Sequence, residues 1–194
     1  MYGESRTLDD ALSAFACSAL GGGLPAPVAA WIDAAGRLQH RPDDALALLE
    51  RARAALPAHP APLIALYRFH FYGHRLAQAR AVGEAALALV RTALGPRVAD
   101  APPTGDAVRY DATVRFQLFV MKGLAYLNLR LGERAAARSL LDELRRLDPD
   151  DRVGGALLLH VLTRDERRAD DDDDDDDDDA LHAHPARGWA ETPR

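Results

Sequence analysis

His70 and His74 are the residues whose type and spacing could most directly do chemistry. They lie four positions apart, and on a helix this spacing places two imidazole groups on one face, where they could bind a metal ion. A zinc hydrolase of the H-E-x-x-H type also needs a glutamate after the first histidine, and Phe71 occupies that position. Gly73 weakens a helix between the two histidines. A metal-binding or enzymatic protein centred on His70 and His74 is therefore the alternative hypothesis. The main prediction is a non-enzymatic protein with no catalytic residue, no metal and no cofactor.

A second group of residues is suited to binding another protein. Arg68, Phe71 and Tyr72 are close in the sequence, and arginine and tyrosine are enriched where protein interfaces gain most of their binding energy. The alternative interpretation is that both aromatic side chains join the core while Arg68 lays its aliphatic part along the surface. We predict that this group contacts a partner protein.

The elements that position these residues are predicted to be helices. Apolar residues, mostly alanine and leucine, recur at three- and four-residue spacing, and no segment alternates as a strand does. Glycine and proline clusters mark the breaks. The resulting all-α prediction has helices over approximately Leu8–Leu20, Pro27–Gly36, Pro42–Leu56, Pro62–Tyr72, Leu76–Leu94, Ala112–Leu131, Glu133–Leu147 and Asp150–Arg164. The connection 95–111 is long enough to be either functional or poorly ordered.

The charge is divided between a mildly basic body and an acidic tail. Residues 170–179 are ten consecutive aspartates, so the chain without them changes from a net charge of −6 to one of +4. That value is far from the strongly basic footprint of a nucleic-acid-binding protein. Poly-aspartate cannot bury enough surface to offset its ordering entropy. We therefore predict a helical domain over 1–165 and a disordered acidic tail over 166–194.

The sequence also predicts a cytoplasmic bacterial protein. Arginine supplies nearly all of the positive charge and Lys122 is the only lysine, a bias that indicates a GC-rich bacterium. The N-terminus lacks the positive and apolar regions of a signal peptide. No stretch approaches the roughly 20 apolar residues of a membrane span. Cys17 is the only cysteine, which excludes an intramolecular disulfide and fits a reducing compartment.

Two segments share a pattern with offsets of four, three and five residues. The pattern comprises Ala45, Leu49, Ala52 and Pro57 in one segment, and Ala137, Leu141, Leu144 and Pro149 in the other. Small residues let one helix lie close to its predecessor, a larger residue fills the seam, and the proline ends the unit.

With the preceding segment MKGLAYLNLRLG, this pattern resembles the tetratricopeptide-repeat (TPR) family, whose units are helix pairs of roughly 34 residues. The resemblance covers Val28–Pro57, Pro60–Leu94 and Arg115–Pro149. It implies a right-handed superhelical stack of antiparallel helix pairs, a TPR-like α-solenoid with three units. The last helix would cap one end and Leu8–Leu20 would seal the other. Connections one and two residues longer than usual, and the lack of a tryptophan at the start of each unit, depart from the family pattern.

The resemblance also implies a concave surface formed by the first helix of each unit. Such a surface typically holds a peptide or helix of another protein, so the implied function is that of an adaptor or assembly factor that is a monomer or a weak homo-oligomer. The implied surface residues are Ala61, Ile64, Arg68, Phe71, Tyr72, Gln117, Val120, Leu124, Leu127 and Asn128. Among them, Arg68, Phe71, Tyr72, Gln117 and Asn128 are the predicted partner-binding residues.

Two longer segments carry a narrower resemblance. LPAHPAPLIALYRFHFYGHRLAQAR and DPDDRVGGALLLHVL look like parts of bacterial TPR proteins associated with nitrogen-fixation loci. This resemblance implies an accessory role in nitrogen fixation.

Overall fold

The computed structural model describes residues 23–38, 40–95 and 103–178, and every regular element in these ranges is a helix. The all-helical prediction is therefore confirmed for the described part of the chain. The helices are α2 (Ala26–Arg37), α3 (Pro42–Ala55), α4 (Pro60–Tyr72), α5 (Leu76–Leu94), α7 (Gly105–Tyr110), α8 (Ala112–Arg130), α9 (Arg134–Leu147) and α10 (Ala156–Asp178).

The predicted helix bounds agree with most of the observed ones to within two residues. Two differences stand out. The connection 95–111 contains the short helix α7, whose first turn is capped by the Thr104 hydroxyl, which accepts a hydrogen bond from the Ala107 amide at 3.2 Å. The second difference is the position of the last helix. The predicted helix Leu8–Leu20 lies outside the described residues.

Local signals explain where the central helices begin. Proline stands in the first turn of α3 and of α4. Backbone amides in a first turn have no acceptor within the helix, so the lack of an amide proton in proline costs no hydrogen bond there. The Asp111 carboxylate caps α8 by accepting hydrogen bonds from the amides of Thr113 at 2.8 Å and Val114 at 3.2 Å. A sharp corner therefore separates α7 from α8.

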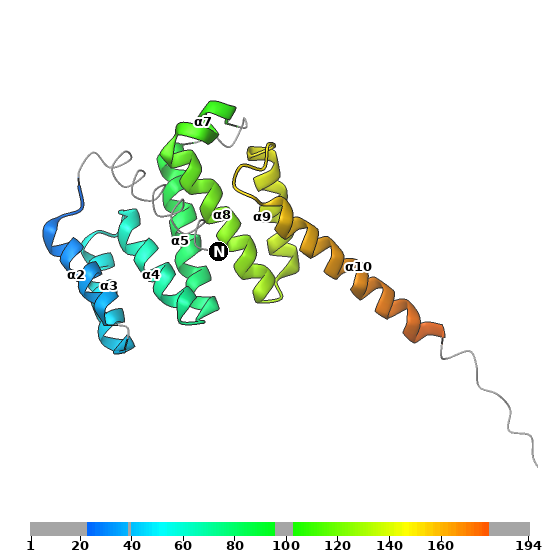
Figure 1. The fold of residues 1–194 in the computed structure, drawn as a ribbon, viewed down its shortest axis with the longest axis horizontal. Coiled ribbons are helices and arrows are strands. Elements are labelled where there is room, and N and C mark those ends of the chain that lie inside the picture. Colours follow the sequence, from blue (N-terminus) through cyan, green and yellow to red (C-terminus); the bar gives the residue numbers. More distant parts are fainter. Residues whose placement is uncertain (1–22, 39, 96–102, 179–194) are drawn as a thin grey trace, which may run out of the picture.

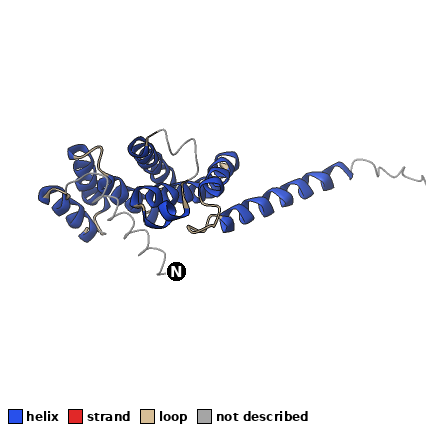
Figure 2. Ribbon diagram, turned by 90° about the horizontal axis from the view of Figure 1, so that it is seen from above, coloured by secondary structure: helices blue, strands red, loops and turns tan. Residues whose placement is uncertain are grey.

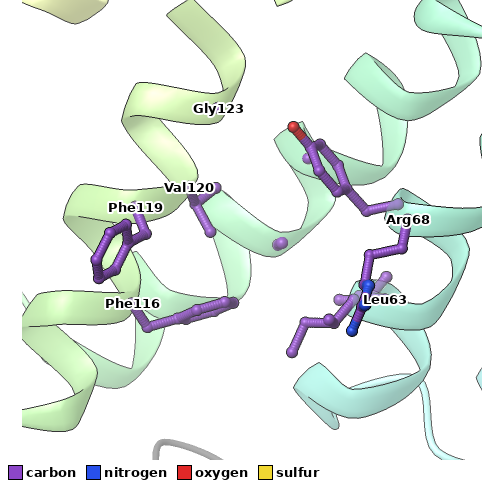
Figure 3. Close-up of a pocket in the computed structure, with 10 residues that line it drawn as sticks. Leu63, Arg68, Phe116, Phe119, Val120 and Gly123 are labelled. Carbon is purple, nitrogen blue, oxygen red and sulfur yellow. The ribbon is translucent and has the colours of Figure 1, made fainter. Parts of the chain in front are cut away.

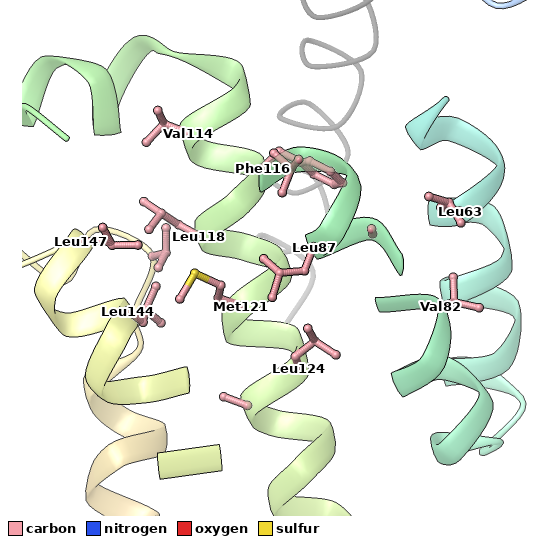
Figure 4. Packing of buried hydrophobic residues seen from close by; sticks show 14 of the residues in the cluster. Leu63, Val82, Leu87, Val114, Phe116, Leu118, Met121, Leu124, Leu144 and Leu147 are labelled. Carbon is pink, nitrogen blue, oxygen red and sulfur yellow. The ribbon is translucent and has the colours of Figure 1, made fainter. Parts of the chain in front are cut away.

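The helices pack mainly on their neighbours in the sequence, in the order α2, α3, α4, α5, α8, α9 and α10 (Figure 1). Helix α8 lies between α5 and α9. Figure 4 shows Met121 and Leu118 of α8 close to Leu144 and Leu147 of α9, while Leu124 and Phe116 lie toward Leu87 of α5. The core is thus a continuous apolar seam that runs along the row of helices.

The apolar positions of the repeated pattern are buried in both segments. In α3 these are Ala45, Leu49 and Ala52, and in α9 they are Ala137, Leu141 and Leu144. Pro57 and Pro149 each follow shortly after the end of their helix. The two matched segments therefore bury the same positions of the pattern, although the third position is alanine in α3 and leucine in α9.

Helix α10 begins at Ala156 instead of near Asp150. The backbone of Asp151 has φ of 51°, and its carboxylate accepts hydrogen bonds from the amides of Gly155 at 2.6 Å and Ala156 at 3.0 Å. Asp148 holds the same turn by accepting from the Val153 amide at 2.9 Å. Residues 148–155 therefore form a turn that is held by aspartate side chains. The spacing of apolar residues cannot predict such a turn.

Helix α10 also continues past Arg164, where the predicted helix ended. Its backbone is helical to Asp178, and it projects away from the row of helices (Figures 1 and 2). Arg138 of α9 forms an ion pair with Glu166, which includes a hydrogen bond from Arg138 Nε at 3.1 Å. This pair holds the helix beyond the predicted end. The tail predicted to be disordered is thus helical over 166–178, and its remainder lies outside the described residues.

Candidate functional site

An apolar pocket lies between α4 and α8, with α5 behind it. We call it the α4–α8 pocket. Figure 3 shows Phe116 and Val120 of α8 on one wall, across from Leu63 and Arg68 of α4 on the other. Its empty volume is about 480 Å³, part of it open to solvent. The lining comprises Leu63, Ile64, Tyr67, Arg68, Gly83, Ala86, Phe116, Phe119, Val120 and Gly123.

Two glycines allow the walls of this pocket to approach each other. A Cβ atom added to Gly123 would lie 2.9 Å from the Tyr67 hydroxyl oxygen. One added to Gly83 would lie 2.8 Å from Leu124 Cδ2. Such separations are shorter than van der Waals contact, so a larger residue at either position would force the facing side chain or the helix to shift.

The Tyr67 ring forms part of the pocket wall, and its hydroxyl stays protonated at neutral pH. Burial, and to a lesser extent the nearby Tyr126 and Tyr72, raise the pKa of Tyr67 to about 12. Desolvation disfavours the phenolate because a charged group loses more hydration energy than a neutral one. The hydroxyl is therefore a neutral polar group at an otherwise apolar wall.

An aromatic cluster extends from Tyr67 toward the C-terminal end of α4. Phe71 stacks on Tyr67 with ring centroids 5.8 Å apart, and it lies 5.9 Å from Tyr126 of α8 and 5.5 Å from Tyr72. The Tyr126 hydroxyl accepts a hydrogen bond from Arg130 at 2.8 Å. Aromatic pairs at these separations are favourable beyond the area they bury. The cluster fixes the relative position of α4 and α8.

A second, larger pocket lies on the other side of α4. This α2–α4 pocket has an empty volume of about 1360 Å³, much of it open, and is lined by residues of α2, α3 and α4, including Ile32, Leu49 and Tyr72. Arg68 lines both pockets. Arg75 closes one end of the α2–α4 pocket, with its guanidinium 4.4 Å from the centre of the Phe69 ring.

The structure divides the five predicted binding residues into two groups. Arg68 and Tyr72 are exposed, and Phe71 is half-buried in the aromatic cluster. Gln117 and Asn128 are only 5% exposed. The predicted arrangement, with both α8 amides facing Arg68 across an open surface, is therefore corrected. Helix α8 is covered by α5 and α9 on opposite sides, so much of its surface is buried. Gln117 and Asn128 lie on this buried part of α8.

The wider predicted surface divides in the same way. Ile64 and Val120 do line the α4–α8 pocket, whereas Leu124 and Leu127 are buried in the core. Phe116 and Phe119 were not among the predicted site residues, because aromatic residues on an apolar helix are usually core. Gly83 and Gly123 could have indicated the pocket from the sequence, because glycine inside a helix lowers its stability and is usually found there for a packing reason.

His70 and His74 do not share a helix face. His70 is buried near the end of α4, while His74 follows that helix in a turn with φ of 55°. Burial and the nearby Arg75 lower the pKa of His70, and Glu50 acts in the opposite direction. The two histidines therefore do not lie on one helix, as the hypothesis of a metal site required. Within the described residues, no three His, Cys, Asp or Glu side chains gather as a possible metal site.

The described helices also include none with the length and apolar character needed to cross a membrane. The most developed chemical feature of the described surface is instead the α4–α8 pocket. Apolar walls suit an aliphatic or aromatic side chain, and the guanidinium of Arg68 suits a carboxylate beside it.

One curated protein resembles this chain clearly. The two are 38% identical over 127 residues, and the match covers 59% of this chain and 67% of the other protein. That protein is described as the "Uncharacterized 19.8 kDa protein in nifW 5'region" of Azotobacter chroococcum mcd 1. No protein-family model matches the chain, and no solved structure matches it.

Proposed function

We propose that this chain, which belongs to the same family as the 19.8 kDa protein from the nifW 5′ region of Azotobacter chroococcum, is a non-catalytic adaptor or assembly factor that binds another protein. The observation that carries the proposal is the α4–α8 pocket, with apolar walls and Arg68 at its edge. The bound element is a peptide or helix that inserts an apolar side chain between α4 and α8. A carboxylate of the same segment pairs with Arg68.

The scaffold in this proposal is a TPR-like solenoid of three helix pairs, α2–α3, α4–α5 and α8–α9, with α10 as the cap. Two observations support it. Successive helices pack on each other along the chain, and the matched positions in α3 and α9 are buried alike. In such a stack α4 and α8 are the first helices of adjacent units, and the groove between them is a place where a TPR-like protein binds its ligand.

The proposed pathway is nitrogen fixation, and it rests on the relative's place in a nifW 5′ region. The partner is accordingly a protein that takes part in nitrogen fixation. The folded body is expected to act as a monomer or a weak homo-oligomer, because one copy carries the whole pocket.

Co-purification of the native partner from nitrogen-fixing cells tests the binding surface. Replacing Arg68 and Ile64, which both line the α4–α8 pocket, together with alanine should remove the partner while helical circular dichroism is unchanged. Truncating a hot-spot residue of an interface costs about 2 kcal/mol or more of binding free energy. Arg134→Ala is the matched control, since Arg134 is an exposed arginine that lines neither pocket. Undiminished recovery with the double variant would contradict the proposed surface.

A second pair of variants tests the apolar part of the pocket. Val120→Glu places a charge within the lining and should also remove the partner. Leu157→Glu makes the same change at a leucine of α10 that is 70% exposed, and it should leave recovery intact. Equal losses from both changes would mean that added charge, and not the pocket, explains the result.

A further inference from the structure

The α4–α8 pocket is open in the described part of the chain, and the same chain carries a segment whose pattern matches it. In the predicted helix Leu8–Leu20, Leu8, Leu12, Phe15 and Ala19 follow the spacing i, i+4, i+7 and i+11. This spacing produces one apolar stripe along a helix. Such a helix is stable in water mainly when its apolar stripe is packed against another surface.

We infer that residues 8–20 dock as a helix in the α4–α8 pocket of their own chain, with Phe15 between the walls formed by Phe116 and Leu63. The pocket has the chemistry that the stripe requires, because its lining is apolar except for the Tyr67 hydroxyl and the Arg68 guanidinium. Aromatic walls favour an inserted aromatic ring.

Charge complementarity supports this occupant. The predicted helix carries Asp9 and Asp10 in its first turn, and Asp9 borders the apolar stripe. Arg68 supplies positive charge at the edge of the pocket. An acidic helix end next to this guanidinium is favourable, and it sets the direction in which the helix lies across α4.

The connection is long enough for this docking. Ile32, Ala35 and Gly36 of α2 line the α2–α4 pocket together with Arg68, so α2 lies on the neighbouring side of α4. Residues 21–25 separate the predicted helix from α2 and begin with Gly21, Gly22 and Gly23. Five extended residues span about 17 Å, and α4 with its side chains is about 10–12 Å across. The segment can therefore cross α4 and reach the α4–α8 pocket.

Docking of this kind has a consequence for binding, and this part rests on the proposed function. A short flexible link gives the tethered segment an effective concentration in the millimolar range. A partner that uses the same pocket must displace it, so its apparent affinity falls in proportion to the fraction of chains with a free pocket.

The single cysteine provides the test in the full chain without a partner. Cys17 and Ser13 lie opposite the Leu8–Phe15 stripe on the predicted helix, so a nitroxide on Cys17 leaves the docked face intact. Because a helix is about 10–12 Å across, the label would lie close to the pocket. We expect paramagnetic broadening of the amide signals of Ile64 and Val120, and little broadening in α9, which lies beyond α8 (Figure 1).

Two matched variants and a mixing experiment decide the result. Phe15→Asp should remove the broadening, whereas Ser13→Asp adds the same charge on the opposite face and should preserve it. No broadening at Ile64 and Val120, or equal broadening in both variants, overturns the inference. Isotope-labelled chains mixed with spin-labelled, unlabelled chains identify a second copy as occupant, and broadening only in that mixture also overturns it. Because no partner is present, failure here is distinct from failure of the proposed function.

Discussion

The Tyr67 hydroxyl oxygen occupies the space that a side chain at position 123 would fill. It lies 2.9 Å from the point where a Cβ atom of Gly123 would stand, and the ring carbon that bears it lies 3.7 Å from that point. At this point, α4 and α8 can approach each other closely because position 123 has no side chain.

Gly123→Ala is expected to destabilise the fold. Overpacking a filled site costs about 1–3 kcal/mol, which exceeds the gain of up to about 1 kcal/mol from removing a helical glycine. We expect a net loss of about 1 kcal/mol in the free energy of unfolding, measured by denaturant titration. Gly36→Ala in α2 is the control, because no atom lies within 4 Å of its added Cβ, and it should stabilise the protein.

The double variant Tyr67→Phe with Gly123→Ala should recover most of that loss, because removing the hydroxyl leaves the Cβ in ordinary contact with the ring. A double-mutant cycle with no coupling between these positions would show that the hydroxyl does not set the helix spacing.

Stability should fall when the pH drops below the ordinary histidine pKa of 6.5. Burial, with Arg75, lowers the pKa of His70 in the folded state, and burial also lowers that of His59. Below pH 6.5 the unfolded chain therefore binds protons that the folded chain does not, so the stability present above this pH is progressively lost toward the folded-state pKa.

Urea titrations at about pH 7.5 and about pH 5.5 measure this loss. His70→Leu should reduce it, since His70 Nδ1 is buried with no hydrogen-bond partner among the described residues and leucine has no proton to gain. His74→Leu is the matched control, because His74 is exposed in the turn after α4. An unchanged pH dependence in His70→Leu would show that other groups cause it.

The start of α10 should depend on Asp151. Its carboxylate accepts from two backbone amides, and its φ of 51° lies in the left-handed region that asparagine tolerates and alanine does not. Asp151→Ala should lower the free energy of unfolding by about 1–2 kcal/mol, from the lost cap and the backbone strain. Asp151→Asn should be nearly neutral. If both variants lose equally in a denaturant titration, the charge itself and not the turn geometry matters.

The ion pair between Arg138 and Glu166 should hold the middle of α10 against α9. Glu166→Gln is expected to speed amide hydrogen exchange in residues 163–168, with little effect on α8. Exchanging the two residues, by Arg138→Glu with Glu166→Arg, should restore much of the protection. Unchanged exchange in the single variant would show that the helix is maintained by its backbone alone.

Residue patterns were enough to predict most of the scaffold. The helices α3, α5, α8 and α9 begin and end within a residue or two of the expected positions, because their apolar spacing and proline breaks are local signals. The start of α10 was missed, because it is fixed by two aspartate side chains that bond to backbone amides across a turn. The helix α7 was missed because six residues carry too little periodicity.

The site was less predictable, because it depends on how helices face each other. Arg68, Ile64 and Val120, which were predicted to share one surface, do line the same pocket. Gln117 and Asn128 were assigned to that surface by register alone. Their burial follows from the packing of α8 between two neighbours, which no local pattern in α8 specifies.

Arg68 lines pockets on both faces of α4, and one guanidinium cannot serve two ligands at once. A ligand that draws this side chain toward α8 withdraws its charge from the α2 side, and a ligand bound there does the reverse. Two ligands that each pair with Arg68, one in either pocket, would therefore compete for a single side chain, and the coupling free energy between them would be the same whichever ligand bound first.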